Sequence, residues 1–180
     1  MKLLLFLVTA SFSFVMLSCD DRSPENCFNI AVLNCNTMHG FANIGLQREL
    51  ESPSLKTTSG DKNNFPPVKR KDILDDKIQH IESNLTSLKQ LKETAETAEL
   101  INASKALYEY VLPVYQHEYR ELVRLYDDEA SAESISSYAQ SIHNRHYAVY
   151  VELIDKLIDA GMPFAEKHNI DVNWDVRTSP

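Results

Sequence analysis

The feature that most restricts the fold is a long amphipathic stretch in the middle of the 180-residue chain, residues 98–126. Large apolar residues recur in it at spacings of three, four and seven, namely at Ile101, Tyr108, Val111, Tyr115, Tyr119, Leu122 and Tyr126. This spacing places them on one face of an α-helix, whereas a strand would alternate with a period of two. The stretch therefore predicts the central helix of a helical bundle.

Pro113 lies inside this stretch. A proline within a helix lacks the N–H donor and clashes with the preceding turn, at a cost of roughly 3 kcal/mol, so a kink or a break is expected there. The apolar face continues in the same phase on both sides of the proline. This continuity favours one kinked helix over two helices joined by a turn.

A heptad-like apolar stripe predicts a helix that begins at Asp72 and precedes the central one. The two helices would otherwise fuse into one far longer than is usual in globular proteins, so a turn is placed in residues 92–97. Thr94 and Thr97 are its candidate capping residues.

A third long helix is predicted to begin after Ser131, a suitable N-cap, and to end at Gly161. Pro163 fits the first turn of a short C-terminal helix, and Trp174 in the tail is expected to pack back on the bundle. The predicted fold class is therefore all-α, an antiparallel helical bundle of three long helices. The central helix is kinked at Pro113, and short helical segments lie at the N- and C-terminal sides.

The N-terminus has the pattern of an export signal. Lys2 is followed by an apolar run that ends at Ser18 without a stop-transfer cluster of charges. The run Met16-Leu17-Ser18-Cys19 resembles the lipobox of bacterial lipoproteins. The resemblance covers only this N-terminal region, in which Met16 and Leu17 depart from the usual residue types.

The resemblance implies that residues 1–18 are a signal peptide and that Cys19 becomes the lipidated first residue of the mature chain. Several acyl chains on one residue make a durable anchor, whereas a single chain binds a membrane only marginally. The expected location is a bacterial cell envelope, with a lipid anchor in its inner or outer membrane. The alternative is an ordinary secretory signal, as in a secreted helical factor of a eukaryote.

Between the signal and the bundle, residues 19–51 are predicted to form a lipidated N-terminal segment with short helices, the first starting at Ser23-Pro24. Residues 52–71 are rich in proline and small polar residues and predict a flexible linker, so the bundle domain is assigned to 72–180. Cys27 and Cys35 lie too far apart for a disulfide on one straight helix, but can pair if the segment bends. The sequence leaves this choice open.

The charge distribution argues against nucleic-acid binding. The chain holds 26 acidic residues against 18 Lys and Arg, with a formal net charge of -8, whereas phosphate binding requires clustered basic residues. Four glycines are present in all, and no glycine-rich phosphate loop, nucleophile turn or Cys-x-x-Cys motif occurs. The sequence predicts neither an enzyme nor a cofactor.

Two groups of residues remain as candidate binding sites. His143 and His146 lie three residues apart on one predicted helix, the spacing of a metal-ligand pair, but no second half of a metal site is evident. We therefore expect no bound metal. Tyr108, Tyr115 and Tyr119 belong to a tyrosine-rich stripe that serves either as bundle core or as a surface for a partner.

The function predicted from the sequence is that of a membrane-anchored envelope lipoprotein with a non-enzymatic helical binding domain for a protein partner. The alternative is a periplasmic bundle that binds a small ligand or a metal. A closed pocket with converging polar groups would favour this alternative, whereas an exposed apolar patch ringed by acidic residues would favour the protein partner.

Overall fold

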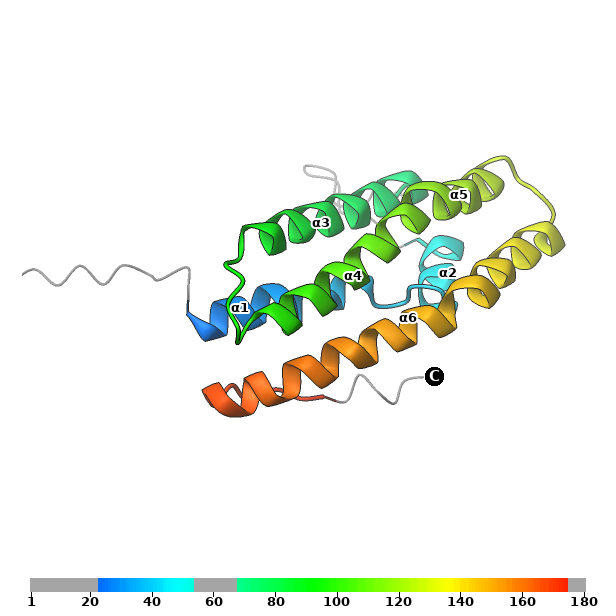
Figure 1. Cartoon of the computed structure of the whole chain (residues 1–180). Coiled ribbons are helices and arrows are strands. Elements are labelled where there is room, and N and C mark those ends of the chain that lie inside the picture. Colours follow the sequence, from blue (N-terminus) through cyan, green and yellow to red (C-terminus); the bar gives the residue numbers. More distant parts are fainter. Residues whose placement is uncertain (1–22, 54–67, 175–180) are drawn as a thin grey trace, which may run out of the picture.

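A computed structural model describes residues 23–53 and 68–174 of the chain (Figure 1). All regular elements in these ranges are helical, so the all-α prediction is confirmed. The predicted signal peptide 1–18, the lipidation residue Cys19 and most of the predicted linker lie outside the described residues. The elements are α1 (Pro24–Ala31), η1 (Leu33–Met38), α2 (Ile44–Glu51), α3 (Arg70–Gln90), α4 (Ala98–Val114), η2 (Tyr115–Tyr119), α5 (Arg120–Asp127) and α6 (Ala132–His168).

Three long helical segments lie lengthwise beside one another (Figure 1). They are α3, the continuous helix formed by α4, η2 and α5, and α6; α4 packs against both α3 and α6. The apolar stripes predicted from the sequence face the common core, where Leu74, Ile81, Leu88, Ile101, Val111 and Leu122 are at most 1% exposed. In the described ranges, no helix combines the length and the apolarity needed to cross a membrane.

The central helix passes Pro113 without a break. Directly after the proline, Tyr115–Tyr119 form a π-helical turn, η2, in place of an α-turn. A π-turn accommodates a disturbed hydrogen-bond ladder by widening the helix, and such turns are frequent at functional sites. α4, η2 and α5 thus follow one another without a gap across Pro113, and the irregularity in this helix is the wide turn at Tyr115–Tyr119.

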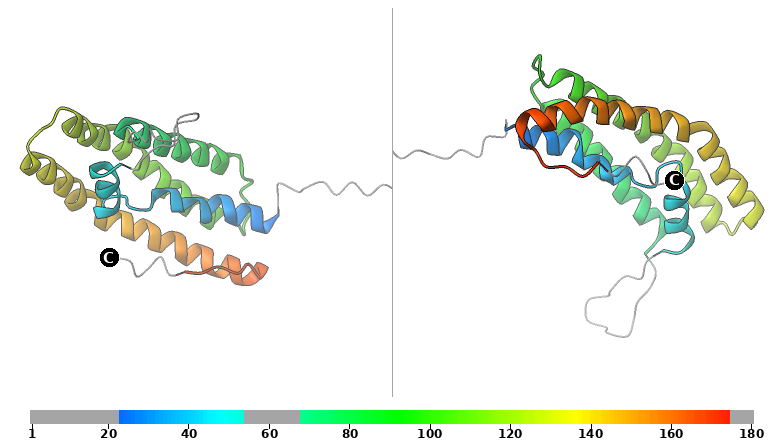
Figure 2. Two further views of the ribbon diagram at one scale, coloured as in Figure 1. Left: turned by 180° about the vertical axis from the view of Figure 1, so that it is seen from behind. Right: turned by 90° about the horizontal axis from the view of Figure 1, so that it is seen from below.

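The N-terminal segment is part of the same core. Viewed from behind, α1 lies between α3 and α6, on the side opposite α4 (Figure 2). Phe28, Met38, Phe41 and Leu50 of this segment are completely buried. Residues 23–51 of the predicted segment 19–51 thus share the core of the long helices, and α3 begins at Arg70, two residues before the predicted start of the bundle 72–180.

The loops beside the central helix match the prediction closely. The turn between α3 and α4 contains Thr94 and Thr97, whose hydroxyl groups bond to each other and to backbone groups of the turn. α6 begins after Ser131, whose hydroxyl oxygen accepts a hydrogen bond from the backbone N–H of Ser134. These boundaries depend on local capping chemistry, which the sequence displays directly.

α6 is longer than predicted, because it continues through Gly161 and Pro163 to His168. The prediction that Gly161 ends the helix, and that a separate short helix follows, is wrong. Ile158, Phe164 and Ala165 are buried on this part of α6, and this packing compensates for the poor helix propensity of Gly161. The last helical residue is His168, and the C-cap residue that follows, Asn169, adopts a left-handed conformation with φ 55°.

The tail after α6 folds back along the bundle, as predicted for Trp174. Its ring packs edge-on against Phe28 of α1, with 5.9 Å between ring centroids. Gly161 makes room for it, because a Cβ at this position would lie 3.1 Å from Cη2 of Trp174 and 3.4 Å from Cγ2 of Val32. Gly161 thus serves close packing, not helix termination.

We predict that Gly161→Leu displaces Trp174 and destabilises the protein by about 1–3 kcal/mol, the usual cost of overpacking. The chain has one tryptophan, so its fluorescence reports on this contact alone. The expected result is a red-shifted emission together with a lower Tm. Ala148→Leu, on the exposed face of α6, is the control that changes neither. Native-like emission from the Gly161→Leu protein would contradict the assigned packing.

Candidate functional site

The three tyrosines proposed as a partner surface lie in the core. Tyr108 and Tyr115 are 0% exposed and Tyr119 is 3% exposed. The structure therefore contradicts their assignment to a surface and supports the alternative that the stripe is bundle core. They lie inside because α1 and the loop before α2 cover the side of the central helix that three long helices alone would leave open.

The π-turn directs two consecutive side chains to different partners. Tyr119 points to the loop before α2, and its hydroxyl oxygen accepts a hydrogen bond from the backbone N–H of Ala42 at 2.9 Å. Glu118 points to α6, where it contacts His146 at 2.8 Å and also pairs with Arg145. The turn thus ties the central helix to both neighbouring elements.

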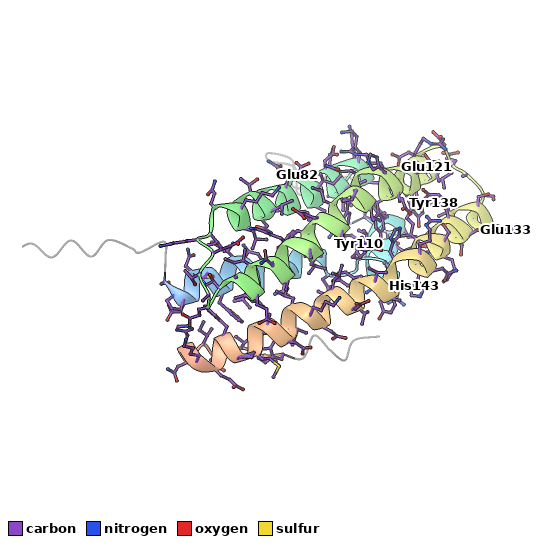
Figure 3. The ribbon with its side chains drawn as sticks, viewed as in Figure 1. Glu82, Tyr110, Glu121, Glu133, Tyr138 and His143 are labelled. Carbon is purple, nitrogen blue, oxygen red and sulfur yellow. The ribbon has the colours of Figure 1, made fainter. Side chains whose placement is uncertain are left out.

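A chain of hydrogen bonds links α4, α6 and η2. Nδ1 of His146 lies 2.8 Å from the hydroxyl of Tyr110, and Nε2 lies 2.8 Å from Oε1 of Glu118. A carboxylate only accepts, so Nε2–H donates to Glu118, and Nδ1 of the neutral ring accepts from Tyr110. Figure 3 shows Tyr110 between the central helix and α6.

The series of hydrogen bonds Tyr110–His146–Glu118 resembles a proton relay in arrangement but is poorly suited to nucleophilic catalysis. Burial raises the pKa of Tyr110, and the charge of Glu118 raises it further, so the phenol remains protonated. Burial also acts to raise the pKa of Glu118, but hydrogen bonds from Arg145 and His146 outweigh it, and the net pKa is lowered. Glu118 is charged and paired with Arg145, and Tyr110 is neutral. These groups therefore serve to hold α4 and η2 against α6.

The two candidate metal ligands face different partners. Nδ1 of His143 lies 2.7 Å from the carbonyl oxygen of Ala42, whereas His146 bonds to Tyr110 and Glu118. Tyr110 and Glu118 lie at opposite nitrogens of the His146 ring, so one metal ion cannot bind all three. The described residues contain no group of three His, Cys, Asp or Glu side chains able to hold a metal.

Cys27 and Cys35 are free, buried thiols. α1 ends at Ala31 and a 3₁₀ helix follows, yet this change of direction does not pair the two cysteines. The thiol of Cys35 instead donates to the carbonyl oxygen of Ala31 at 3.5 Å. Burial raises the pKa of Cys35 to about 12, so this thiol is unreactive.

An open pocket of about 400 Å³ lies where the loop before α2, α2 itself, the π-turn with α5, and α6 meet. Its size falls within the usual range of small-molecule sites. His143 of α6, labelled in Figure 3, is one of the lining residues. The others are Ala42, Asn43, Ile44, Gln47, Tyr119, Leu122, Ala139, Gln140, Ile142 and Tyr147.

The wall of this pocket contains a strained residue. Ala42 has a φ of 51°, in the left-handed region that costs a non-glycine residue of order 1–3 kcal/mol. Both of its backbone polar groups are held by side chains: the N–H donates to Tyr119, and the carbonyl accepts from Nδ1–H of His143. The pocket is thus a fixed structure in which the π-turn and α6 hold one loop residue between them.

A second cavity, of about 110 Å³, lies beneath the C-terminal tail beside Trp174, Cys35 and Tyr150. It is much smaller, and its outer wall is the tail itself. The pocket around Ala42 is therefore the candidate functional site.

Sequence reasoning identified His143 but not the pocket. Gln47 and Gln140 are common polar residues on exposed helix faces and carry no distinguishing signal. Tyr119 was singled out, but its role is to hold Ala42, which depends on a contact across 77 positions of the chain. No local sequence pattern encodes such a contact.

Comparisons with protein families, with curated proteins and with solved structures find no match to this chain.

Proposed function

We propose that this chain is a lipid-anchored protein of a bacterial cell envelope, attached to the inner or outer membrane, whose helical domain binds a small ligand and catalyses no reaction. The observation that carries the binding role is the open pocket of about 400 Å³ around Ala42. The anchor is supported by the resemblance of Met16-Leu17-Ser18-Cys19 to a lipobox.

The pocket favours a small ligand over a protein partner. The tyrosine surface considered for a partner is buried, whereas the pocket is concave and combines apolar walls with several polar side chains. Such pockets are the usual form of small-molecule sites, while protein interfaces are broader. The strain at Ala42 supports the same role, because strain is retained where a site requires a particular backbone geometry.

The fold serves this role as a rigid frame. We further propose that α3, the helix from α4 to α5, and α6 act as an antiparallel three-helix bundle, closed on one side by α1.

The test of the binding role uses N-phenyl-1-naphthylamine, an uncharged probe whose fluorescence rises in an apolar environment. We expect the full-length protein to bind it, and Ala139→Phe, which fills the pocket from α6, to abolish binding. Ala148→Phe, on the exposed face of the same helix, is the matched control and retains binding. No binding to the wild type, or equal binding to both variants, would refute the pocket as the site.

The anchor is tested separately. We expect Cys19→Ser to remove the protein from the membrane fraction and from the detergent phase on partitioning, because the acyl chains would have no other attachment. Cys27→Ser, at a buried free thiol, is the control that leaves partitioning unchanged. A Cys19→Ser protein that still enters the detergent phase would refute the lipid anchor.

A further inference from the structure

The walls of the pocket around Ala42 carry few polar groups and no charged ones. We infer that its ligand is a neutral amphiphile, with an apolar body and a hydroxyl group that donates its one hydrogen bond to Gln47. This inference rests on the proposed binding function and names the class of ligand. Three observations support it: the absence of charge in the lining, the unused acceptors and the apolar walls.

The lining contains no charged side chain. None of its eleven residues is Asp, Glu, Lys or Arg, although 24% of the chain is charged. A charged ligand would lose hydration in this pocket without gaining a counter-charge, which is strongly unfavourable. The lining therefore selects a neutral ligand.

Three lining residues, Gln47, Gln140 and His143, carry hydrogen-bond acceptors that have no partner among the described residues. Nε2–H of Gln47 donates to the carboxylate of Glu51 at 2.8 Å, and since a carboxylate only accepts, this fixes the amide orientation. Nδ1–H of His143 donates to the carbonyl of Ala42, so Nε2 of the neutral ring is an acceptor. Neither Oε1 of Gln47 nor Nε2 of His143 has a partner among the described residues.

Unpartnered acceptors in an uncharged site match a ligand that donates a hydrogen bond. A hydroxyl group is the simplest neutral donor, and it also accepts, which suits the remaining amide of Asn43. Oδ1 of Asn43 already accepts from the N–H of Gly45 at 2.7 Å. An ether of the same size can accept from Asn43 but cannot donate to Gln47, so this wall favours the alcohol.

The rest of the lining is apolar. Ile44, Leu122, Ala139 and Ile142 contribute aliphatic surface, and Tyr119 and Tyr147 contribute ring faces. Apolar surface removed from water contributes about 25 cal/mol per Å² to binding, so an alkyl or aromatic body is favoured here. The lining thus combines an apolar body site with a small neutral head site.

The test measures displacement of N-phenyl-1-naphthylamine from the full-length protein by four probes of similar length near neutral pH. These are octan-1-ol, octanoate, octylammonium and 1-methoxyheptane. We expect octan-1-ol to bind at least about tenfold more tightly than either ion, a difference that one unpaired buried charge readily exceeds. Loss of the donor should make 1-methoxyheptane several-fold weaker than octan-1-ol.

Gln47→Met keeps the length of the side chain and removes the acceptor. We expect it to reduce the preference for octan-1-ol over 1-methoxyheptane, measured as the ratio of the two affinities in the same variant. Gln79→Met, exposed on α3 and outside the pocket lining, is the matched control with the wild-type preference.

The outcomes separate this inference from the proposed function. An ion that binds as tightly as octan-1-ol would overturn the inference, as would an ether that binds as tightly as the alcohol. The same holds if the preference persists in Gln47→Met. In each case the pocket remains a binding site as long as Ala139→Phe abolishes binding of the fluorescent probe. Loss of probe binding to the wild type itself would instead refute the binding function.

Discussion

Replacing Phe41 by alanine is expected to lower the free energy of unfolding by about 3–5 kcal/mol, the usual cost of removing a fully buried aromatic ring. Phe41 is 0% exposed and lies in the loop between η1 and α2. Its ring centroid lies 5.0 Å from that of Tyr150 and 5.5 Å from that of Tyr115. It therefore joins the N-terminal segment to both the central helix and α6.

Chemical denaturation followed by circular dichroism measures this effect. Ile44→Ala, three residues away and 53% exposed, is the control and should change stability by well under 1 kcal/mol. A Phe41→Ala protein as stable as the control would mean that residues 23–51 do not share the core of the long helices.

Alkaline pH is expected to unfold the protein cooperatively, with the loss of stability beginning near pH 9 and growing steeply above about pH 10. Burial raises the pKa of the Cys35 thiol to about 12 and that of Tyr126 to about 12. Burial is also the main cause that raises the pKa of four more tyrosines above the ordinary value, namely Tyr108, Tyr115, Tyr119 and Tyr150.

The direction in which stability changes with pH follows from the number of protons bound by the folded and the unfolded chain. A raised pKa means that the folded protein keeps a proton that the unfolded chain releases. The stabilisation is therefore fully present below the unfolded pKa and is lost as the pH rises through the folded pKa. Each such group contributes up to about 1.4 kcal/mol per pH unit within its window. Several groups acting together make this the largest pH effect expected for the chain.

Far-ultraviolet circular dichroism and the absorbance of tyrosinate measure this transition together. Both should change at the same pH, because the buried tyrosines ionise only when the core opens. The Cys35→Ala variant should lose less stability than the wild type between about pH 9 and pH 10, because one of the two buried thiols whose pKa is raised no longer titrates. Complete tyrosine ionisation near pH 10 in a chain that remains helical would contradict the burial of these rings.

The helices of this protein were predictable because their signals are local. The stripe from Ile101 to Tyr126 and the Ser131 cap each depend on residues within a few turns of the helix, and both appear in the structure as predicted. The helix end predicted at Gly161 is wrong because the glycine is required for close packing against Trp174 and Val32, not for helix termination. Burial on α6 outweighed the local propensity.

The candidate site was less predictable. His143 was noted for its spacing from His146, but the structure gives the two rings different partners, Ala42 and the Tyr110–Glu118 pair. For Tyr119 the sequence allows either bundle core or a partner surface, because no local pattern shows what covers its face of the helix. The N-terminal segment supplies that cover, and a sequence reading that treats the segment as separate cannot anticipate it.

The sequence by itself determined the all-helical class, the course of the central helix through Pro113 and the start of α6. Period, proline and capping chemistry act over short distances along the chain, so one sequence is enough to reveal them. Three features depend on the tertiary structure alone. They are the π-turn that directs Glu118 and Tyr119 to different partners, the strained backbone of Ala42, and the uncharged pocket around Ala42. These features arise from contacts between residues as far apart as Ala42 and His143, whose pairing depends on the packing of the whole bundle.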